Sequence, residues 1–288
     1  MTSYQLSNIH NNLDGYNKLF NLYDTHKEDI FETLELQMTE WFDANLSAVL
    51  GAILDRITND GLNTIEFKTV SSNIQKILQK NSFLEHYGFN TIYDTYNTTI
   101  KYLKLKTTDS RYFNDYVEND LLSRNELPKM SEAVHEKIGE SIHEMFINAK
   151  IHSETEFIYT CGQFFPRDNN LNFTIVDSGI GFAKRIEKNL GYSLSSKDAI
   201  KWAMEDGHTT KQNVSGGIGL ALLKEFILQN KGKIQIISGD AFYELSNTIV
   251  TIQQLKYYFD GSIISMTFKT NDTVSYLLAD EINSSDIF

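Results

Sequence analysis

Three short motifs in the second half of the chain, in a fixed order, constrain its fold more than any other feature. Glu144 and Asn148 lie four residues apart in an apolar, helix-like stretch, and an Asp-x-Gly-x-Gly sequence that begins at Asp177 follows a strand-like run. The third motif, residues 215–220, is glycine-rich and opens another apolar helical stretch. Each motif is weak alone. Their order predicts a nucleotide site, for ATP rather than a dinucleotide.

Length and charge limit the classes of protein that this chain can represent. Its 288 residues suit one large domain or two ordinary ones, and a hydrophobic content of 41% is ample for a buried core. The net charge of −12 disfavours nucleic acid as a partner, because phosphate backbones need a basic surface. A small anion site built from backbone amides remains compatible with this acidity.

Cysteine use and the N-terminal sequence bear on the compartment. Cys161 is the only cysteine, so no intramolecular disulfide can form, and a reducing compartment is expected. The first residues lack the basic and apolar segments of a secretory signal. No apolar run reaches the roughly 18–20 residues of a membrane helix. We therefore expect a soluble cytoplasmic protein with no membrane partner.

A polar stretch at residues 114–129 is the expected domain boundary, which gives domains at 1–120 and 121–288. The first domain alternates strand-like and helix-like patterns, which predicts an α/β layer. Its strands are expected at 33–38 and 63–67, and its helices at 45–57 and 72–84.

The second domain is expected to be an α+β layer in which helices accompany antiparallel strands. Its helices are predicted at 131–151 and 217–229, and its strands at 154–165, 171–176, 233–238, 248–255 and 262–268. Residues 182–214 are long, polar and weakly periodic, so we expect a functional lid there. We also expect this lid, or the helix at 131–151, to contact the first domain or a second protomer.

The spacing of Glu144 and Asn148 places both side chains on one face of a helix. An amide oxygen is a hard ligand suited to Mg²⁺, and a carboxylate can take a proton from an attacking water. A solvated helix face would give the same spacing, so this motif alone leaves both interpretations open.

Asp177 closes an apolar strand, and its ionised carboxylate could accept a hydrogen bond from the exocyclic amine of adenine. Gly179 and Gly181 would let the backbone turn and approach a flat ring closely. A simple strand-ending turn is the alternative interpretation.

The third motif places glycines where a helix begins, and free amides at a helix N-terminus favour phosphate. A glycine-rich loop without a ligand is the alternative. The hydroxyls and cation just before the motif extend the expected phosphate site. Its candidate residues are Thr209, Thr210, Lys211, Gly216, Gly217, Gly219 and Leu220.

Taken together, the three motifs resemble those of the GHKL ATPases, the family of DNA gyrase and the histidine-kinase catalytic domains. The resemblance covers roughly residues 125–270 and implies a two-layer Bergerat fold, a mixed sheet covered by helices. It implies that Asn148 binds Mg²⁺, that Asp177 binds the adenine amine and that Gly179 and Gly181 line the base pocket. It also implies that glycines 217 and 219 meet the phosphates, with 182–214 as the ATP lid.

Within this family, residues 143–152 look most like the anti-sigma-factor serine kinases, which also carry a glutamate before the asparagine. This similarity implies a catalytic role for Glu144 as the base in ATP hydrolysis or phosphotransfer. Ser215 departs from the pattern, because it stands where the family usually has its first glycine.

Residues 41–50 are similar to the strand-to-helix turn of STAS domains, the anti-anti-sigma-factor fold. In that family an aspartate is usually followed by a phosphorylatable serine. Here Ala44 follows Asp43, so the switch is missing unless Ser47 substitutes for it. An unrelated α/β domain is the alternative.

Two functions from different classes fit these residues. One is a Mg²⁺-dependent GHKL regulator that hydrolyses ATP slowly or phosphorylates a partner protein. The other is a non-catalytic module whose ATP or ADP state controls a protein interface. A cytoplasmic histidine kinase is the least favoured, because no suitable phosphoacceptor histidine is visible. A regulatory protein partner is expected, and a homodimer is compatible with the sequence.

Overall fold

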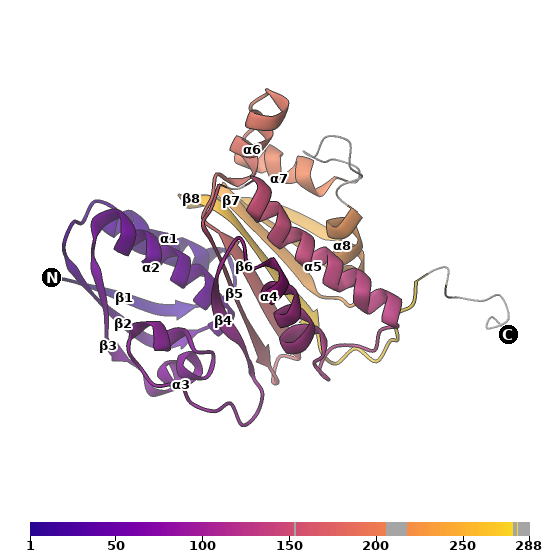
Figure 1. The fold of residues 1–288 in the computed structure, drawn as a ribbon, viewed down its shortest axis with the longest axis horizontal. Coiled ribbons are helices and arrows are strands. Elements are labelled where there is room, and N and C mark those ends of the chain that lie inside the picture. The colour runs from indigo at the N-terminus through magenta and orange to yellow at the C-terminus, as the bar shows by residue number, and fades with distance from the viewer. Residues whose placement is uncertain (153, 206–217, 279–280, 282–288) are drawn as a thin grey trace.

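The chain builds two sheets of opposite character, one parallel and one antiparallel (Figure 1). The computed structural model describes residues 1–152, 154–205, 218–278 and 281. The parallel sheet has three strands in the order β1-β2-β3, and the antiparallel sheet has five in the order β4-β5-β6-β8-β7. The expectation of an α/β first half and an antiparallel second half is confirmed at this level.

Strands and helices alternate in the N-terminal unit, which confirms the predicted α/β pattern. Its elements are β1 (Thr2–Ile9), α1 (Leu13–His26), β2 (Thr33–Phe42), the short helix η1 (Ala44–Leu46), α2 (Ser47–Gly61), β3 (Thr64–Val70), α3 (Ser72–Lys80) and the short helix η2 (Phe83–Tyr87). The helix expected over 72–84 ends at Lys80, because Ser82 adopts a left-handed conformation before η2 begins.

The second sheet and its helices occupy the rest of the chain. Its elements are β4 (Thr99–Lys106), α4 (Ser110–Tyr116), the π-helix η3 (Val117–Leu122), α5 (Glu132–His152), β5 (Phe157–Phe165), β6 (Asn170–Asp177), α6 (Gly181–Leu190), α7 (Ser196–Met204), α8 (Ile218–Gln229), β7 (Lys233–Ser246) and β8 (Ile249–Lys269). β4 precedes the expected boundary at residue 120 but pairs with β5, so the division between the two sheets falls earlier in the chain.

The expected mixed sheet is wrong, because every pairing among the described strands of the second sheet is antiparallel. Short connections produce this result: β5–β6 and β7–β8 are each hairpins, and a tight turn can join only antiparallel strands. The three strands expected after residue 232 are two long ones. Gly239 and Gly261 adopt positive φ values at irregularities where the sequence suggested that strands would end.

The part of the expected lid, residues 182–214, that the structure describes is largely helical, although its weak periodicity predicted no helix. α6 and α7 cover most of residues 181–204. The apolar positions of α6 are sparse, but Ile186 is buried and fixes one face of the helix. The remainder of the expected lid, residues 206–214, lies outside the described residues.

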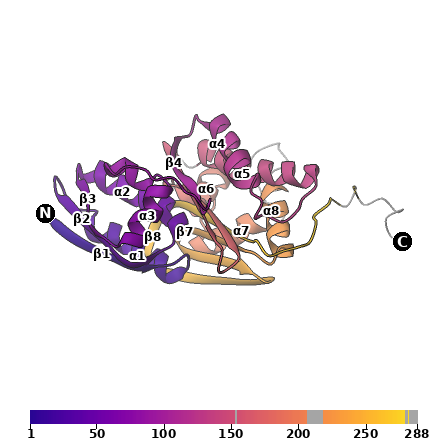
Figure 2. The ribbon, with the colours of Figure 1, turned by 90° about the horizontal axis from the view of Figure 1, so that it is seen from below.

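Side chains along β5 and β6 point alternately to the two faces of the second sheet, and both faces are buried. Ile158, Phe173 and Ile175 pack toward α4, α5 and α8. Tyr159, Cys161 and Val176 pack into a core shared with the N-terminal unit. The five-stranded sheet thus lies between that unit and α5 (Figures 1 and 2).

Aromatic side chains join the N-terminal unit to β7 and β8. Phe20 stacks on Phe259 with 5.1 Å between ring centroids, and Tyr16 lies 5.9 Å from Phe242. Burying each such ring stabilises the fold by about 1.5–3 kcal/mol. α5 lies on the other face of the sheet, which separates it from the N-terminal unit. The predicted contact of α5 with that unit is therefore wrong, whereas a contact with a second protomer stays a prediction.

Candidate functional site

The C-terminal half of α5 adjoins the end of β6. Ile138, Ile142 and Phe146 bury one face of α5 against the sheet, and the predicted helix over 131–151 is confirmed. The chain leaves α5 at residue 152 and enters β5 at Phe157, and the next residue, Ile158, pairs with Asp177. The C-terminal end of α5 and the end of β6 therefore lie toward the same end of the sheet's strands, and the charges of both Glu144 and Asp177 act on Arg185.

Asp177 is a buried carboxylate, 6% exposed, at the last position of β6. Its Oδ1 accepts a hydrogen bond from the Gly179 N–H at 3.0 Å, and its Oδ2 accepts one from the Ser262 hydroxyl. Burial raises the pKa of Asp177 above its usual range, while Ser262, Gly179 and the charge of Arg185 counteract the rise. A carboxylate has about four acceptor positions, so capacity for another donor remains.

Asn148 carries a buried polar atom that lacks a partner. Its Oδ1 is shielded from solvent and accepts no hydrogen bond within the described structure. A buried acceptor left in this state costs roughly 1–3 kcal/mol, so such groups call for an explanation. The Ser178 hydroxyl, next to Asp177, is also buried without a partner in the described part of the chain. Both orphaned atoms belong to the motifs singled out in the sequence.

A magnesium ion fits this donor set only together with phosphate oxygens. Within the described residues, no group of three His, Cys, Asp or Glu side chains could hold a metal ion. Mg²⁺ commonly keeps waters and takes one or two protein ligands plus substrate phosphates, rather than a cage of side chains. The unsatisfied amide oxygen of Asn148 could serve as one such protein ligand to the metal.

Arg185 is a site residue that sequence reasoning missed. It lies on α6, half-buried, and the charges of both Asp177 and Glu144 act on it. Burial lowers the pKa of Arg185 to about 10, and the two carboxylates counteract that change. The only sequence signal was its place four residues after Gly181, within a stretch interpreted as a lid rather than a helix.

Gly181 is needed for close packing where α6 begins. Its φ is +72°, and a Cβ atom there would lie 2.6 Å from Ser238 Oγ and 2.8 Å from the Gly261 carbonyl oxygen. The Phe182 N–H donates to Ser238 Oγ at 2.9 Å. The structure therefore places Gly181 against β7 and β8, where it sets the direction of α6.

The third motif is described only in part. α8 begins at Ile218, so Gly219 and Leu220 lie in its first turn. The other residues expected to contact phosphate lie outside the described residues: Thr209, Thr210, Lys211, Gly216 and Gly217.

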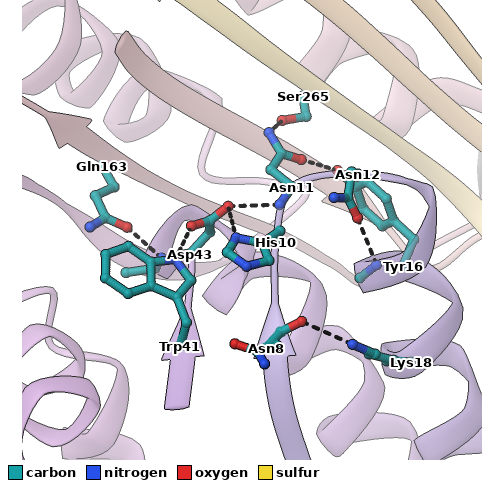
Figure 3. A network of polar contacts seen from close by, with 12 residues as sticks. Asn8, His10, Asn11, Asn12, Tyr16, Lys18, Trp41, Asp43, Gln163 and Ser265 are labelled. Carbon is teal, nitrogen blue, oxygen red and sulfur yellow. Dashed lines mark hydrogen bonds and ion pairs between the residues drawn. The ribbon is translucent and has the colours of Figure 1, made fainter. Parts of the chain in front are cut away.

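The turn that follows β2 contacts both sheets, because Asn11 beside it bonds to Ser265 of β8 and Gln163 of β5 accepts from the Ala44 N–H (Figure 3). Asp43 Oδ2 accepts from the Asn11 N–H at 2.7 Å, and Oδ1 accepts from Trp41 Nε1 at 2.6 Å. Desolvation raises the pKa of Asp43. Ser47 is fully buried and accepts a hydrogen bond from Asn81, so it is inaccessible as a substitute phosphorylation site.

The buried thiol of Cys161 has no role in this site. Burial raises its pKa to about 12, so it stays a neutral thiol near neutral pH.

Comparisons with known proteins leave the family of this chain open. No protein-family model matches it, and a search of curated proteins finds no similar sequence. No helix in the described part of the chain combines the length and the apolar character that a membrane crossing requires.

Proposed function

We propose that the protein binds Mg-ATP as a regulator of the GHKL type and either hydrolyses ATP slowly or phosphorylates a partner protein. One observation carries the proposal: Asn148, near the C-terminal end of α5, presents a buried amide oxygen that accepts no hydrogen bond. A buried acceptor without a partner calls for an explanation, and a bound ligand is one. Nine other described side chains also carry such an atom, but of these only Ser178 belongs to the same sequence motifs.

The charge distribution supports the same proposal. Arg185 responds to both Asp177 and Glu144, so residues from β6, α5 and α6 share one electrostatic environment. Titratable groups clustered with perturbed pKa values are typical of functional sites. The antiparallel sheet with α5 and α8 packed on one face is also compatible with the Bergerat fold that the motifs imply.

Each residue would have a distinct task. Bound Mg-ATP supplies the phosphoryl group and the divalent cation. Asn148 would hold the cation through its amide oxygen, and Asp177 would accept a hydrogen bond from the adenine amine. Glu144 would take the proton of the attacking water or hydroxyl group. The amides at the start of α8 would face the phosphates.

Calorimetry of Mg-ATP binding tests the central observation. Asn148→Ala removes the proposed cation ligand and should weaken Mg-ATP binding at least about tenfold, a change of about 1.4 kcal/mol. Asn119→Ala is the matched control, because Asn119 is exposed on η3. Equal affinities for the wild type and Asn148→Ala would remove Asn148 from the metal site.

Phosphate release separates catalysis from sensing. Glu144→Ala should abolish steady-state phosphate release, whereas Glu140→Ala, one turn earlier on α5, should not. Glu140 is exposed and pairs only weakly with Lys137 on the surface, at 3.3 Å. Turnover that Glu144→Ala leaves intact would exclude Glu144 as the base.

A second candidate is a non-catalytic ATP sensor, and the position of Arg185 favours it. A cation within electrostatic reach of Glu144 competes with a water molecule for that carboxylate. The departure at Ser215 from the usual glycine pattern points in the same direction. Mg-ATP binding without measurable phosphate release or phosphotransfer would select this candidate.

A further inference from the structure

An irregular segment of β8 touches three separate parts of the molecule. Ser238 pairs with Ser262 and Gly239 pairs with Phe259, which leaves Asp260 and Gly261 as extra residues on β8. We call residues 260–262 the β8 bulge. Bulges bend a strand locally and are common next to functional sites.

The first contact is with Asp177, the proposed adenine-binding residue. The Ser262 hydroxyl donates to the Asp177 carboxylate, and the two residues are register partners in β6 and β8. Gly261 has a φ of +112°, and a Cβ atom there would lie 2.1 Å from the Asp177 carbonyl oxygen. The bulge and Asp177 are therefore in direct contact, so neither can shift without the other.

The second contact is with the start of α6, directly after the Asp-x-Gly-x-Gly motif. Ser238 Oγ accepts from the Phe182 N–H and donates to the Gly261 carbonyl oxygen, each at 2.9 Å. Lys184 Nζ also lies 3.4 Å from Asp260 Oδ1. The direction of α6 is thus tied to the bulge.

The third contact crosses into the N-terminal unit. Arg56, on α2, places Nη2 3.2 Å from Asp260 Oδ2. Tyr23 on α1 holds this guanidinium: its ring centroid lies 4.2 Å from the Arg56 Cζ, and its hydroxyl accepts from Nη2 at 2.8 Å. Arg56 is only 23% exposed, so a fixed cation joins two units that are far apart in sequence.

We propose that the β8 bulge couples nucleotide binding at Asp177 to the N-terminal unit, through the Asp260–Arg56 ion pair. This inference rests on the proposed function. A bound nucleotide can shift the N-terminal unit between two conformations only if the nucleotide binds the protein with different affinity in each conformation. Asp260 is suited to such a response, because it bonds to α6 on one oxygen and to α2 on the other.

Hydrogen exchange with and without Mg-ATP tests the coupling in the full chain. In the wild type, amide exchange within α2 should slow when Mg-ATP binds. Asp260→Asn should remove this change while still binding Mg-ATP. Because the ion pair is partly exposed, its coupling is at most about 1 kcal/mol, so the Kd should change about fivefold or less.

Two further variants keep the result specific. Arg56→Gln should remove the same change in α2, and the double variant should lose nothing more, because both substitutions break one link. Asp240→Asn is the matched control, since Asp240 accepts from Gln254 on the neighbouring strand and should leave the coupling intact. Unchanged thermal unfolding would show that each variant is folded.

The outcomes distinguish this proposal from the proposed function. A wild type that does not bind Mg-ATP overturns both. A wild type that binds Mg-ATP with unchanged exchange in α2 overturns the coupling alone. The coupling is likewise overturned if Asp260→Asn and the wild type show equal nucleotide-dependent changes in α2.

Discussion

The turn after β2 and the turn after β6 both place a buried aspartate at the end of a strand. Only the turn after β6 leaves the residues that follow the aspartate partly exposed to solvent. Asp43 is 8% exposed and Asp177 is 6% exposed. After Asp43, residues 44–47 are completely buried, and Gln163 of β5 accepts from the Ala44 N–H. After Asp177, residues 178–180 are only half-buried.

This difference separates a structural carboxylate from a candidate binding carboxylate. The Asp43 turn is enclosed between two folded units, and both of its carboxylate oxygens accept hydrogen bonds from the N-terminal unit itself. The Asp177 turn leads into Gly181 and α6 and contains the unsatisfied Ser178 hydroxyl. The Asp43 turn also contains an unsatisfied oxygen, Asn45 Oδ1, but that residue is completely enclosed. The environment of an acid, more than its burial or its place in a strand, indicates what it does.

The largest expected effect concerns the enclosed turn. Ser47→Asp mimics phosphorylation and places a charge where the side chain is completely buried. We expect a loss of about 3–5 kcal/mol in the free energy of unfolding, because an unpaired buried charge is strongly destabilising. Urea denaturation measures this loss, and Ser47→Ala, which removes one hydrogen bond, should cost only about 1 kcal/mol. Similar stabilities for the two variants would show that the turn opens readily.

Sequence periodicity predicted the elements whose burial is regular. β2, β3, β5 and β6 and the helices α2, α5 and α8 were all expected, since their apolar spacing is clear. β1 and α1 were not expected, because both are rich in polar residues, and Leu6 and Ile9 are the only fully buried residues of β1. α6 was missed for a similar reason, since it buries Ile186 alone.

The residues of the candidate site also fall into two groups, those that local sequence spacing predicted and those that it could not predict. Asp177 and Asn148 were proposed from local spacing, and the structure shows Asp177 at the buried end of β6 and an unsatisfied Asn148 oxygen near the C-terminal end of α5. Arg185 and Ser262 could not be proposed, since their roles depend on how α6 and β8 pack around Asp177. Tertiary contacts of this kind leave no pattern in the neighbouring sequence.

The second prediction compares the two aspartates by nucleotide affinity. Asp177→Asn should weaken ATP binding at least about tenfold, because an amide cannot replace both the charge and the acceptor capacity of the carboxylate. Asp43→Asn should leave the Kd for ATP within about twofold. The wild type should also bind GTP at least about tenfold more weakly than ATP, since guanine lacks the amine at that position. Calorimetry measures all three, and equal losses for the two variants would contradict the comparison.

The third prediction compares one hydrogen-bond donor from each turn. Trp41→Phe removes the Nε1 donor to Asp43, and Ser262→Ala removes the hydroxyl donor to Asp177. Each should cost about 1–3 kcal/mol of unfolding free energy, because a buried acceptor loses its partner. Only Ser262→Ala should also change ATP affinity. An affinity change in Trp41→Phe of the same size would show that the enclosed turn reaches the nucleotide.

The smallest expected effect is a dependence on pH, and it has a definite sign. The pKa of Asp43 is raised in the folded protein, so its contribution to stability is complete below its unfolded value. That contribution is lost as the pH rises through the folded pKa. The wild type should therefore lose stability relative to Asp43→Asn as the pH increases from about 4, which denaturation at several pH values would measure. A difference that grows in the opposite direction would contradict the raised pKa.

The same reasoning gives Asp177 a pH dependence that involves the ligand. Burial also raises its pKa, so the Asp177 carboxyl group ionises at a higher pH than an exposed aspartate does. The adenine amine needs the carboxylate as an acceptor, and ATP affinity should therefore rise as the pH increases through the pKa of Asp177. Asp177→Asn should flatten this part of the profile, whereas Asp43→Asn should leave it unchanged. Because ATP itself titrates equally in all three proteins, a profile that Asp177→Asn does not alter would exclude this carboxylate from adenine recognition.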